Sequence, residues 1–187
     1  IRDTRREITA SLVRDPESST RTSFSASYSK EDDYKAASLD IERSVALSPV
    51  LTLGYGASIS HDAIEPTDAL IYDRVRHESK NTVSVFGSLA WVLDRMSVLQ
   101  VGLQATRHDG YLSDPYKRVY VDGEILRDAR PDMHSQAALL VRYRRAVSTD
   151  AALHADYRFA FDSWGLRSHT VELAWYQSLG SGWRIVP

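Results

Sequence analysis

Long segments in which apolar and polar residues alternate recur along the whole chain and restrict what it can fold into. In residues 51–60, for example, leucine, tyrosine, alanine and isoleucine alternate with threonine, glycine and serine. A period of two is typical of a β-strand with one apolar and one polar face. Nine such segments precede a tenth that starts at Trp183, and they cover residues 5–13, 20–30, 35–46, 50–60, 82–93, 97–107, 134–145, 150–161 and 167–177. The chain is therefore predicted to be all-β and antiparallel.

The length of these segments distinguishes two kinds of antiparallel sheet. Strands of soluble sheets usually have about 5–6 residues, whereas a tilted strand needs about 9–11 residues to cross a bilayer. The predicted strands have the membrane length. Short turns such as residues 46–50 alternate with connections that include two long loops, at about 61–81 and 108–133. Short periplasmic turns and longer outer loops alternate in this way in outer-membrane barrels, so the pattern predicts an up-and-down transmembrane β-barrel.

Three aromatic residues support the membrane orientation. Trp91, Tyr143 and Trp175 are the apolar-face residues nearest the short-turn ends of their strands. Aromatic girdles flank the apolar band of such barrels, although strands of any protein are enriched in aromatic residues. The apolar face is expected to contact lipid, with Leu53, Tyr55, Val101, Leu103, Leu139, Val141, Phe159, Val171 and Leu173 pointing outward. The polar face is expected to line the lumen, with Ser25, Ser58, Gln104, Arg142, Asp156 and Glu172 pointing inward.

The composition excludes several other classes of protein. Lys plus Arg is 23 and Asp plus Glu is 25, so no excess of positive charge favours nucleic-acid binding. The absence of cysteine excludes disulfides, thiolate catalysis and Cys-ligated zinc. Neither a GxSxG nucleophile motif nor a phosphate-binding glycine loop is present. We therefore expect no enzymatic activity, no cofactor and no nucleic-acid partner, and we expect the lipid bilayer as the main partner.

The last three complete strands place ionisable side chains on the polar face. The predicted lumen charge cluster consists of Arg142, Arg144, His154, Asp156, Arg158 and Glu172. Neighbouring strands bring such groups within reach of one another. An ion pair of Arg142 or Arg144 with Asp156 or Glu172 is expected, because an unpaired charge in a poorly hydrated interior is costly. The cluster fits either a charged constriction that selects a solute or a plugged lumen in which the charges only neutralise one another.

A second group of candidate residues falls at the long-loop end of the predicted strands. Its members are His108, Asp109, Tyr111, Asp114, Tyr116, Lys117, Arg130, Asp132, Asp162 and His169. Imidazole and carboxylate groups can bind a divalent transition metal, but no spacing such as HExxH supports a site, and polar rims collect His and Asp anyway. Residues 110–136 are expected to form the largest outer loop, with a small hairpin at Asp122–Gly123. Whether a metal binds there is left open by the sequence.

Several short motifs are similar to those of one bacterial family. They are EDDY (31–34), GYLSDPYK (110–117), RPD (130–132), YR (157–158), DSWG (162–165), SHTVEL (168–173) and the final IVP. In these motifs the chain resembles the family called domain of unknown function thirty-five seventy. The resemblance implies a Gram-negative envelope protein of barrel type, without an established activity, in a family whose members are longer and tend to be encoded beside a small lipoprotein and flavin-transfer or thioredoxin-like proteins. It assigns no catalytic residue, and the family's Asp-Asp pair before Trp-Gly is here Asp162-Ser163.

These observations lead to three functional hypotheses. The first is an outer-membrane β-barrel of a Gram-negative bacterium that acts as a channel or as a scaffold for a small lipoprotein. The second is an envelope metal-binding or redox-associated protein with a site at the outer loops, and the third is a soluble antiparallel β-protein that binds a ligand. Residues 1–187 are expected to be one β-barrel domain and part of a longer chain, because an even strand number and periplasmic termini require about twelve strands.

Overall fold

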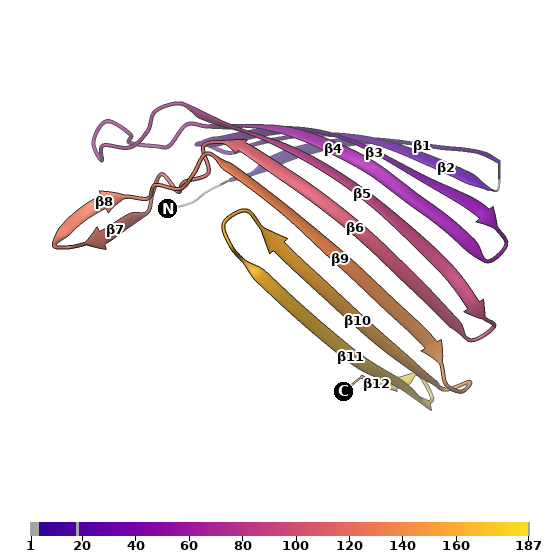
Figure 1. Cartoon of the computed structure of the whole chain (residues 1–187). Coiled ribbons are helices and arrows are strands. Elements are labelled where there is room, and N and C mark those ends of the chain that lie inside the picture. Colours follow the sequence, from indigo (N-terminus) through magenta and orange to yellow (C-terminus); the bar gives the residue numbers. More distant parts are fainter. Residues whose placement is uncertain (1–3, 18, 187) are drawn as a thin grey trace.

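One long antiparallel sheet dominates the computed structural model, which describes residues 4–17 and 19–186 (Figure 1). Its ten strands are hydrogen-bonded to one another in the order in which they occur in the chain, with β6 paired to β9. The strands are β1 (Arg6–Glu17), β2 (Thr20–Lys30), β3 (Tyr34–Ser48), β4 (Leu51–Ile64), β5 (Glu78–Asp94), β6 (Ser97–Gly110), β9 (Met133–Ala146), β10 (Ala151–Asp162), β11 (Arg167–Gly180) and β12 (Trp183–Ile185). The predicted all-β, up-and-down antiparallel fold is confirmed.

A separate hairpin, β7 (Arg118–Val121) and β8 (Glu124–Arg127), extends from the connection between β6 and β9 (Figure 1). Its turn has positive φ angles at Asp122 (50°) and Gly123 (92°), which is the backbone of a two-residue hairpin turn. The hairpin expected from the Asp-Gly pair is therefore present. No helix long and apolar enough to cross a membrane occurs in the described part of the chain.

Several strands are longer than the alternation predicts. β1 continues through Pro16, where the sequence predicts a turn, and its pairing with β2 is irregular between Arg14 and Glu17. A proline without an N–H group is tolerated there because β1 is an edge strand. At the opposite end, β4, β5, β6 and β9 continue past the apolar segments, so the long loops shorten to residues 65–77 and 111–132. In these extensions the polar residues pair through backbone hydrogen bonds in the same way as the apolar residues do.

The register separates the residues of the sheet into an apolar and a polar face. Directly opposed residues of antiparallel strands lie on the same face. One such row runs across six strands and contains Leu53, Leu89, Val101, Val141, Tyr157 and Val171. The outward and inward sets predicted from the alternation fall on opposite faces, as expected.

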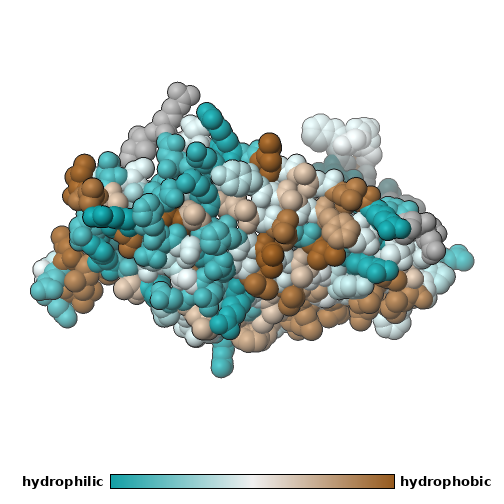
Figure 2. Space-filling model, turned by 90° about the horizontal axis from the view of Figure 1, so that it is seen from above, coloured by the Kyte–Doolittle hydropathy of each residue, from teal (hydrophilic) through white to brown (hydrophobic). Residues whose placement is uncertain are grey.

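Most side chains on the apolar face are covered by no other part of the described protein. Leu103, Val171 and Leu173 are 63%, 68% and 67% exposed, and Ile64 is the one hydrophobic residue that is buried among the described residues. Figure 2 shows hydrophobic patches over the strands, while hydrophilic side chains gather toward the end with the long connections. A single-layer sheet with an uncovered apolar face is suited to contact with lipid. It does not fit a soluble barrel, whose apolar residues would fill a closed interior.

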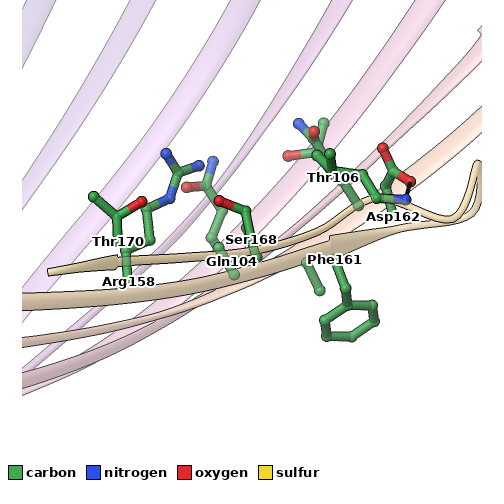
Figure 3. A pocket seen from close by; sticks show the side chains of 12 residues that line it. Gln104, Thr106, Arg158, Phe161, Asp162, Ser168 and Thr170 are labelled. Atoms are coloured by element: carbon green, nitrogen blue, oxygen red, sulfur yellow. Dashed lines mark hydrogen bonds between the residues drawn. The ribbon is translucent and has the colours of Figure 1, made fainter.

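The ten strands form an open, curved wall. β1 and β12 are the two edges of the sheet, and they are not paired with each other in the described residues. β1 begins at the end that carries the long connections, whereas β12 begins at the short-turn end (Figure 1). The sheet curves toward the side on which polar-face residues such as Arg158 and Thr170 lie (Figure 3), so the polar face is the concave side of the wall.

Candidate functional site

The predicted lumen charge cluster is assembled on the polar face of β9, β10 and β11. Asp156 is its centre, because it lies directly opposite Arg142 on β9 and Glu172 on β11. Arg144 donates hydrogen bonds from both Nη atoms to the Asp156 carboxylate, with 2.8 Å between Nη2 and Oδ2. Arg142 Nε lies 3.8 Å from the same carboxylate. The predicted ion pair between these strands is confirmed.

Not all charges of the cluster are neutralised. Arg158 and Glu172 form no ion pair with any residue in the described parts of the chain. Glu172 is instead opposite Asp156, and like charges in this position are destabilising. His154 lies toward the short turns, where its ring packs against Tyr176 with 4.2 Å between the ring centroids. Arg142 and Arg144 thus share the Asp156 carboxylate, while Arg158 and Glu172 are exposed and unpaired in the described residues.

Hollows on the polar face extend away from this cluster. One of about 200 Å³ is lined by Gln104, Thr106, Arg158, Asp162, Ser168 and Thr170, among others. Figure 3 shows these side chains on the side toward which the sheet curves and Phe161 on the other side. A hollow of about 510 Å³ extends from Glu42 on β3 to Arg142 and Arg158, and one of about 260 Å³ includes Ser25 and Asp40. All three hollows have Gln104 in their lining, and we call the three together the polar groove, which extends from β2 to β11.

Phe86 is an aromatic residue within this polar groove. It lies opposite Gly56 on β4 and Gln104 on β6, both of which are polar-face positions. A Cβ atom at Gly56 would lie 2.5 Å from the Phe86 ring, so glycine allows the ring to lie close to the backbone of β4. Phe86, Asp40 and Glu42 are absent from the residues that the sequence predicts on the polar face. Asp40 and Glu42 alternate along β3 in step with Ser38, and Phe86 alternates along β5 in step with Ser84 and Ser88. The period of two was therefore sufficient to place all three on the polar face.

At the end of the strands that carries the long connections, Tyr116 joins three of these connections. Its hydroxyl donates a hydrogen bond to Asp33 and accepts one from the Thr67 N–H at 3.2 Å. The Arg74 guanidinium lies over the Tyr116 ring, 4.5 Å from its centroid. Asp33 belongs to the EDDY motif and Tyr116 to the GYLSDPYK motif. We call this group of Asp33, Thr67, Arg74 and Tyr116 the three-loop junction, and it gives both motifs a structural role.

One ion pair and two hydrogen bonds attach the β7–β8 hairpin to Tyr72 and Asp73, which precede Arg74 of the three-loop junction. Arg127 forms an ion pair with Asp73, and this contact lowers the pKa of the Asp73 carboxyl. Arg118 donates hydrogen bonds to the carbonyl groups of Tyr72 and Asp73. The charges of the longest connection therefore hold it against residues 65–77.

Alkaline pH is expected to loosen the three-loop junction. Burial, together with the hydrogen bond to Asp33, raises the pKa of Tyr116 above its ordinary value of about 10. The folded loop thus favours the protonated hydroxyl, and the stabilisation is present below pH ~10 and lost as the pH rises through the raised pKa. Tyr116→Phe should increase subtilisin cleavage within residues 111–132 roughly fivefold near pH 8, since one hydrogen bond contributes about 1 kcal/mol.

The matched control for this change is Tyr120→Phe in the same connection. Tyr120 is 73% exposed, so its hydroxyl should contribute little and cleavage should stay at the wild-type rate. The wild-type protein should show increased cleavage above pH ~10, where tyrosine ionises, and Tyr116→Phe should lack most of this increase. An identical pH profile in both proteins would contradict the role assigned to Tyr116.

The other candidates of the long connection bond within it. Tyr116 N donates to Asp114 Oδ1 at 2.9 Å, and Arg130 Nε lies 2.9 Å from Asp128 Oδ2. The Asp132 carbonyl accepts a hydrogen bond from Gly110 N at 2.8 Å. Tyr111 is partly buried, and this burial raises the pKa of its hydroxyl. The Lys117 side chain is exposed and makes no hydrogen bond or ion pair in the described residues.

Two candidate histidines and two candidate carboxylates at this end are strand residues, and they do not converge on one point. His108, Asp109 and Asp162 lie in β6 and β10 because these strands extend beyond their apolar segments. His169 lies in β11, within the strand that the sequence predicts. His169 is on the apolar face opposite Phe159. Within the described residues, no three His, Asp or Glu side chains form a group able to hold a metal ion. The structure therefore does not bring these candidates together, and metal binding at this end stays a hypothesis.

Asp162 has a structural role in the DSWG motif. Its carboxylate accepts hydrogen bonds from the N–H groups of Trp164 and Leu166 at 3.0 and 2.8 Å, and Oδ2 lies 2.9 Å from His134 Nε2. The His134 ring packs against Trp164, with 4.2 Å between the ring centroids. The motif thus closes the connection between β10 and β11 and attaches it to β9.

Comparisons with known proteins agree with the fold. The family model described as "Protein of unknown function (DUF3570)" matches residues 1–187. The structure is similar to the siderophore receptor PirA from Pseudomonas aeruginosa and that from Acinetobacter baumannii, with TM-scores of 0.67 and identities of 14% and 12%. Each match covers 96% of this chain but 32% of the receptor, so the chain spans about a third of their length.

A third solved structure, the translocator domain of autotransporter NalP from Neisseria meningitidis, aligns with a TM-score of 0.35 and 13% identity, over 98% of this chain and 72% of that domain. No curated protein matches the chain. At these identities the likeness to the receptors extends to the fold alone, which is that of an outer-membrane β-barrel wall.

Proposed function

We propose that this chain, which belongs to the DUF3570 family, forms part of the wall of a barrel that gives small polar solutes passage across the outer membrane of a Gram-negative bacterium. The observation that carries this proposal is the polar groove, a series of neighbouring hollows on the concave face of the sheet. Its hollows share Gln104 and extend from Ser25 on β2 to Thr170 on β11. The uncovered apolar face supplies the complementary surface for lipid.

The state of the charges favours a passage over a plugged lumen. In a plugged lumen the buried charges are expected to neutralise one another, because an unpaired buried charge is costly. Here the Arg142 side chain is 45% exposed and contacts Asp156 only at 3.8 Å, and Arg158 lines two hollows without an ion pair in the described residues. Both side chains are exposed in the described residues, which suits the wall of a hydrated passage.

Conductance of the full-length protein in a planar bilayer tests this proposal. The wild-type protein is expected to conduct salt. Replacing both Arg142 and Arg158 by alanine should raise the ratio of cation to anion permeability by at least about twofold, because fixed positive charges concentrate anions in a narrow passage. The control is Arg107→Ala, which removes an exposed arginine from the apolar face and should leave the ratio unchanged. Absence of conductance, or an unchanged ratio in the double variant, would count against a passage lined by this groove.

A second candidate function is a scaffold for a small lipoprotein, and exposed apolar side chains on the long connections favour it. Leu70 and Ile71 are 75% and 76% exposed, and Tyr120 and Ile125 are 73% and 72% exposed. Tyr120 and Ile125 lie opposite each other on the hairpin, and clustered apolar side chains of this kind mark contact surfaces. If the protein conducts no salt, and Ile125→Ser abolishes co-purification of a lipoprotein, this function replaces the first.

A further inference from the structure

The two ends of the polar groove differ in charge: the β3 end is acidic, whereas the β9–β11 end has three arginines and two carboxylates and is therefore basic by one charge. Asp40 and Glu42 lie on the polar face of β3, in rows that contain Ser58, Gly56, Phe86 and Gln104. Arg142 and Arg158 lie on the polar face of β9 and β10. Between them, the polar-face residues that line the groove on β4, β5 and β6 are uncharged, namely Ser58, Ser84, Phe86, Ser88, Gln100, Gly102, Gln104 and Thr106.

The acidic and basic ends belong to the same hollow. Glu42, Arg142 and Arg158 all line the hollow of about 510 Å³, together with Phe86. Glu42 and Arg158 are both exposed and form no ion pair within residues 4–17 and 19–186. Opposite charges that are held apart by the sheet cannot neutralise each other directly, so a solute with two complementary ends gains from both.

We propose that the groove binds an elongated zwitterion, namely a short peptide with free termini, whose carboxylate contacts Arg158 and whose ammonium group contacts Glu42. Arg142 and Asp40 reinforce the two ends, and the Phe86 ring packs against the aliphatic part between them. A guanidinium binds a carboxylate through charge-assisted hydrogen bonds, which are among the strongest available in a protein. This assignment rests on the proposed passage, whose substrate class it names.

The spacing of the two ends sets the length of the peptide. β3 and β10 are five positions apart in the order of the sheet, which is about 24 Å along its arc. The Glu42 and Arg158 side chains both extend into the groove and shorten the span. An extended tetrapeptide is about 14 Å long, so peptides of about four residues fit, whereas a single amino acid is too short to reach both ends.

Four forms of tetra-alanine test the proposal, with binding to the full-length protein in detergent measured by calorimetry. They are the free zwitterion, the N-acetylated anion, the C-terminal amide cation, and the neutral peptide with both ends blocked. The zwitterion is expected to bind at least about tenfold more tightly than either singly charged form, because it retains both charge contacts. Equal affinity of all four forms, or no binding of the zwitterion, would overturn the proposal without any need for a variant.

Two variants test which residue binds each end of the peptide. Arg158→Gln should abolish the preference for a free carboxylate, and Glu42→Gln should abolish the preference for a free amine. The matched controls are Arg107→Gln and Asp109→Asn, which neutralise exposed charges on the apolar face and should leave all four affinities unchanged. A preference that survives both groove substitutions overturns the assignment. Salt conductance is measured separately, so a protein that conducts but does not discriminate loses the peptide site and keeps the passage.

Discussion

Val101→Arg is expected to lower the free energy of unfolding in a phospholipid bilayer by about 2–4 kcal/mol, the cost of an arginine on the lipid face near the midplane. Val101 is near the middle of β6 and lies opposite Leu89 and Val141 on the apolar face. The described protein places no second layer over this face of the sheet, so a charge introduced there is expected to meet the hydrocarbon. Urea unfolding of the full-length protein in vesicles, followed by tryptophan fluorescence, measures the loss.

Gln104→Arg, three residues further along the same strand, provides the matched control. Gln104 is on the polar face and lines all three hollows of the groove, where an added charge remains hydrated. The expected loss is therefore less than about 1 kcal/mol. Similar losses for both variants would contradict the assignment of the apolar face to lipid, since that assignment requires the two faces to differ.

Gly110→Ala should destabilise the protein by about 2–3 kcal/mol, because it combines a strained backbone with a steric clash. Gly110 has a φ angle of 116°, and a Cβ atom there would lie 2.3 Å from the Ser79 carbonyl oxygen. The same carbonyl accepts a hydrogen bond from Tyr111 N at 2.8 Å. The substitution thus forces apart β5 and the start of the long connection, and thermal unfolding combined with protease sensitivity of residues 111–132 reports both effects.

Gly123→Ala separates backbone strain from the clash. Gly123 also has a positive φ angle, 92°, but a Cβ atom at this hairpin turn would meet no atom within 4 Å. Its replacement is expected to cost about 1 kcal/mol and to affect the hairpin alone. If Gly110→Ala proved no more harmful than Gly123→Ala, the close approach between β5 and residue 110 would not be important for stability.

The strands and their two faces were predictable because both depend on local information. A period of two reports which side chains share a face, and this holds wherever the strand is placed. The contact between Arg144 and Asp156 was predictable for the same reason, since both follow the polar parity of strands that are consecutive in the predicted sheet. Strand ends were less predictable, because backbone pairing continues into polar residues such as His61 and Asp109 that carry no alternation signal.

Only the tertiary structure decided which distant residues meet. Tyr116 and Asp33 are separated by 83 positions in the chain, and no local pattern relates two connections that the sheet brings together. The groove has the same origin, since Glu42 and Arg158 line one hollow only because the sheet curves toward its polar face. Curvature is a collective property of many strands, and side chains that alternate along each strand report its faces but not the distance across the sheet. The sequence by itself therefore determined the strands and the orientation of their side chains, whereas the curvature decided which charges share a site.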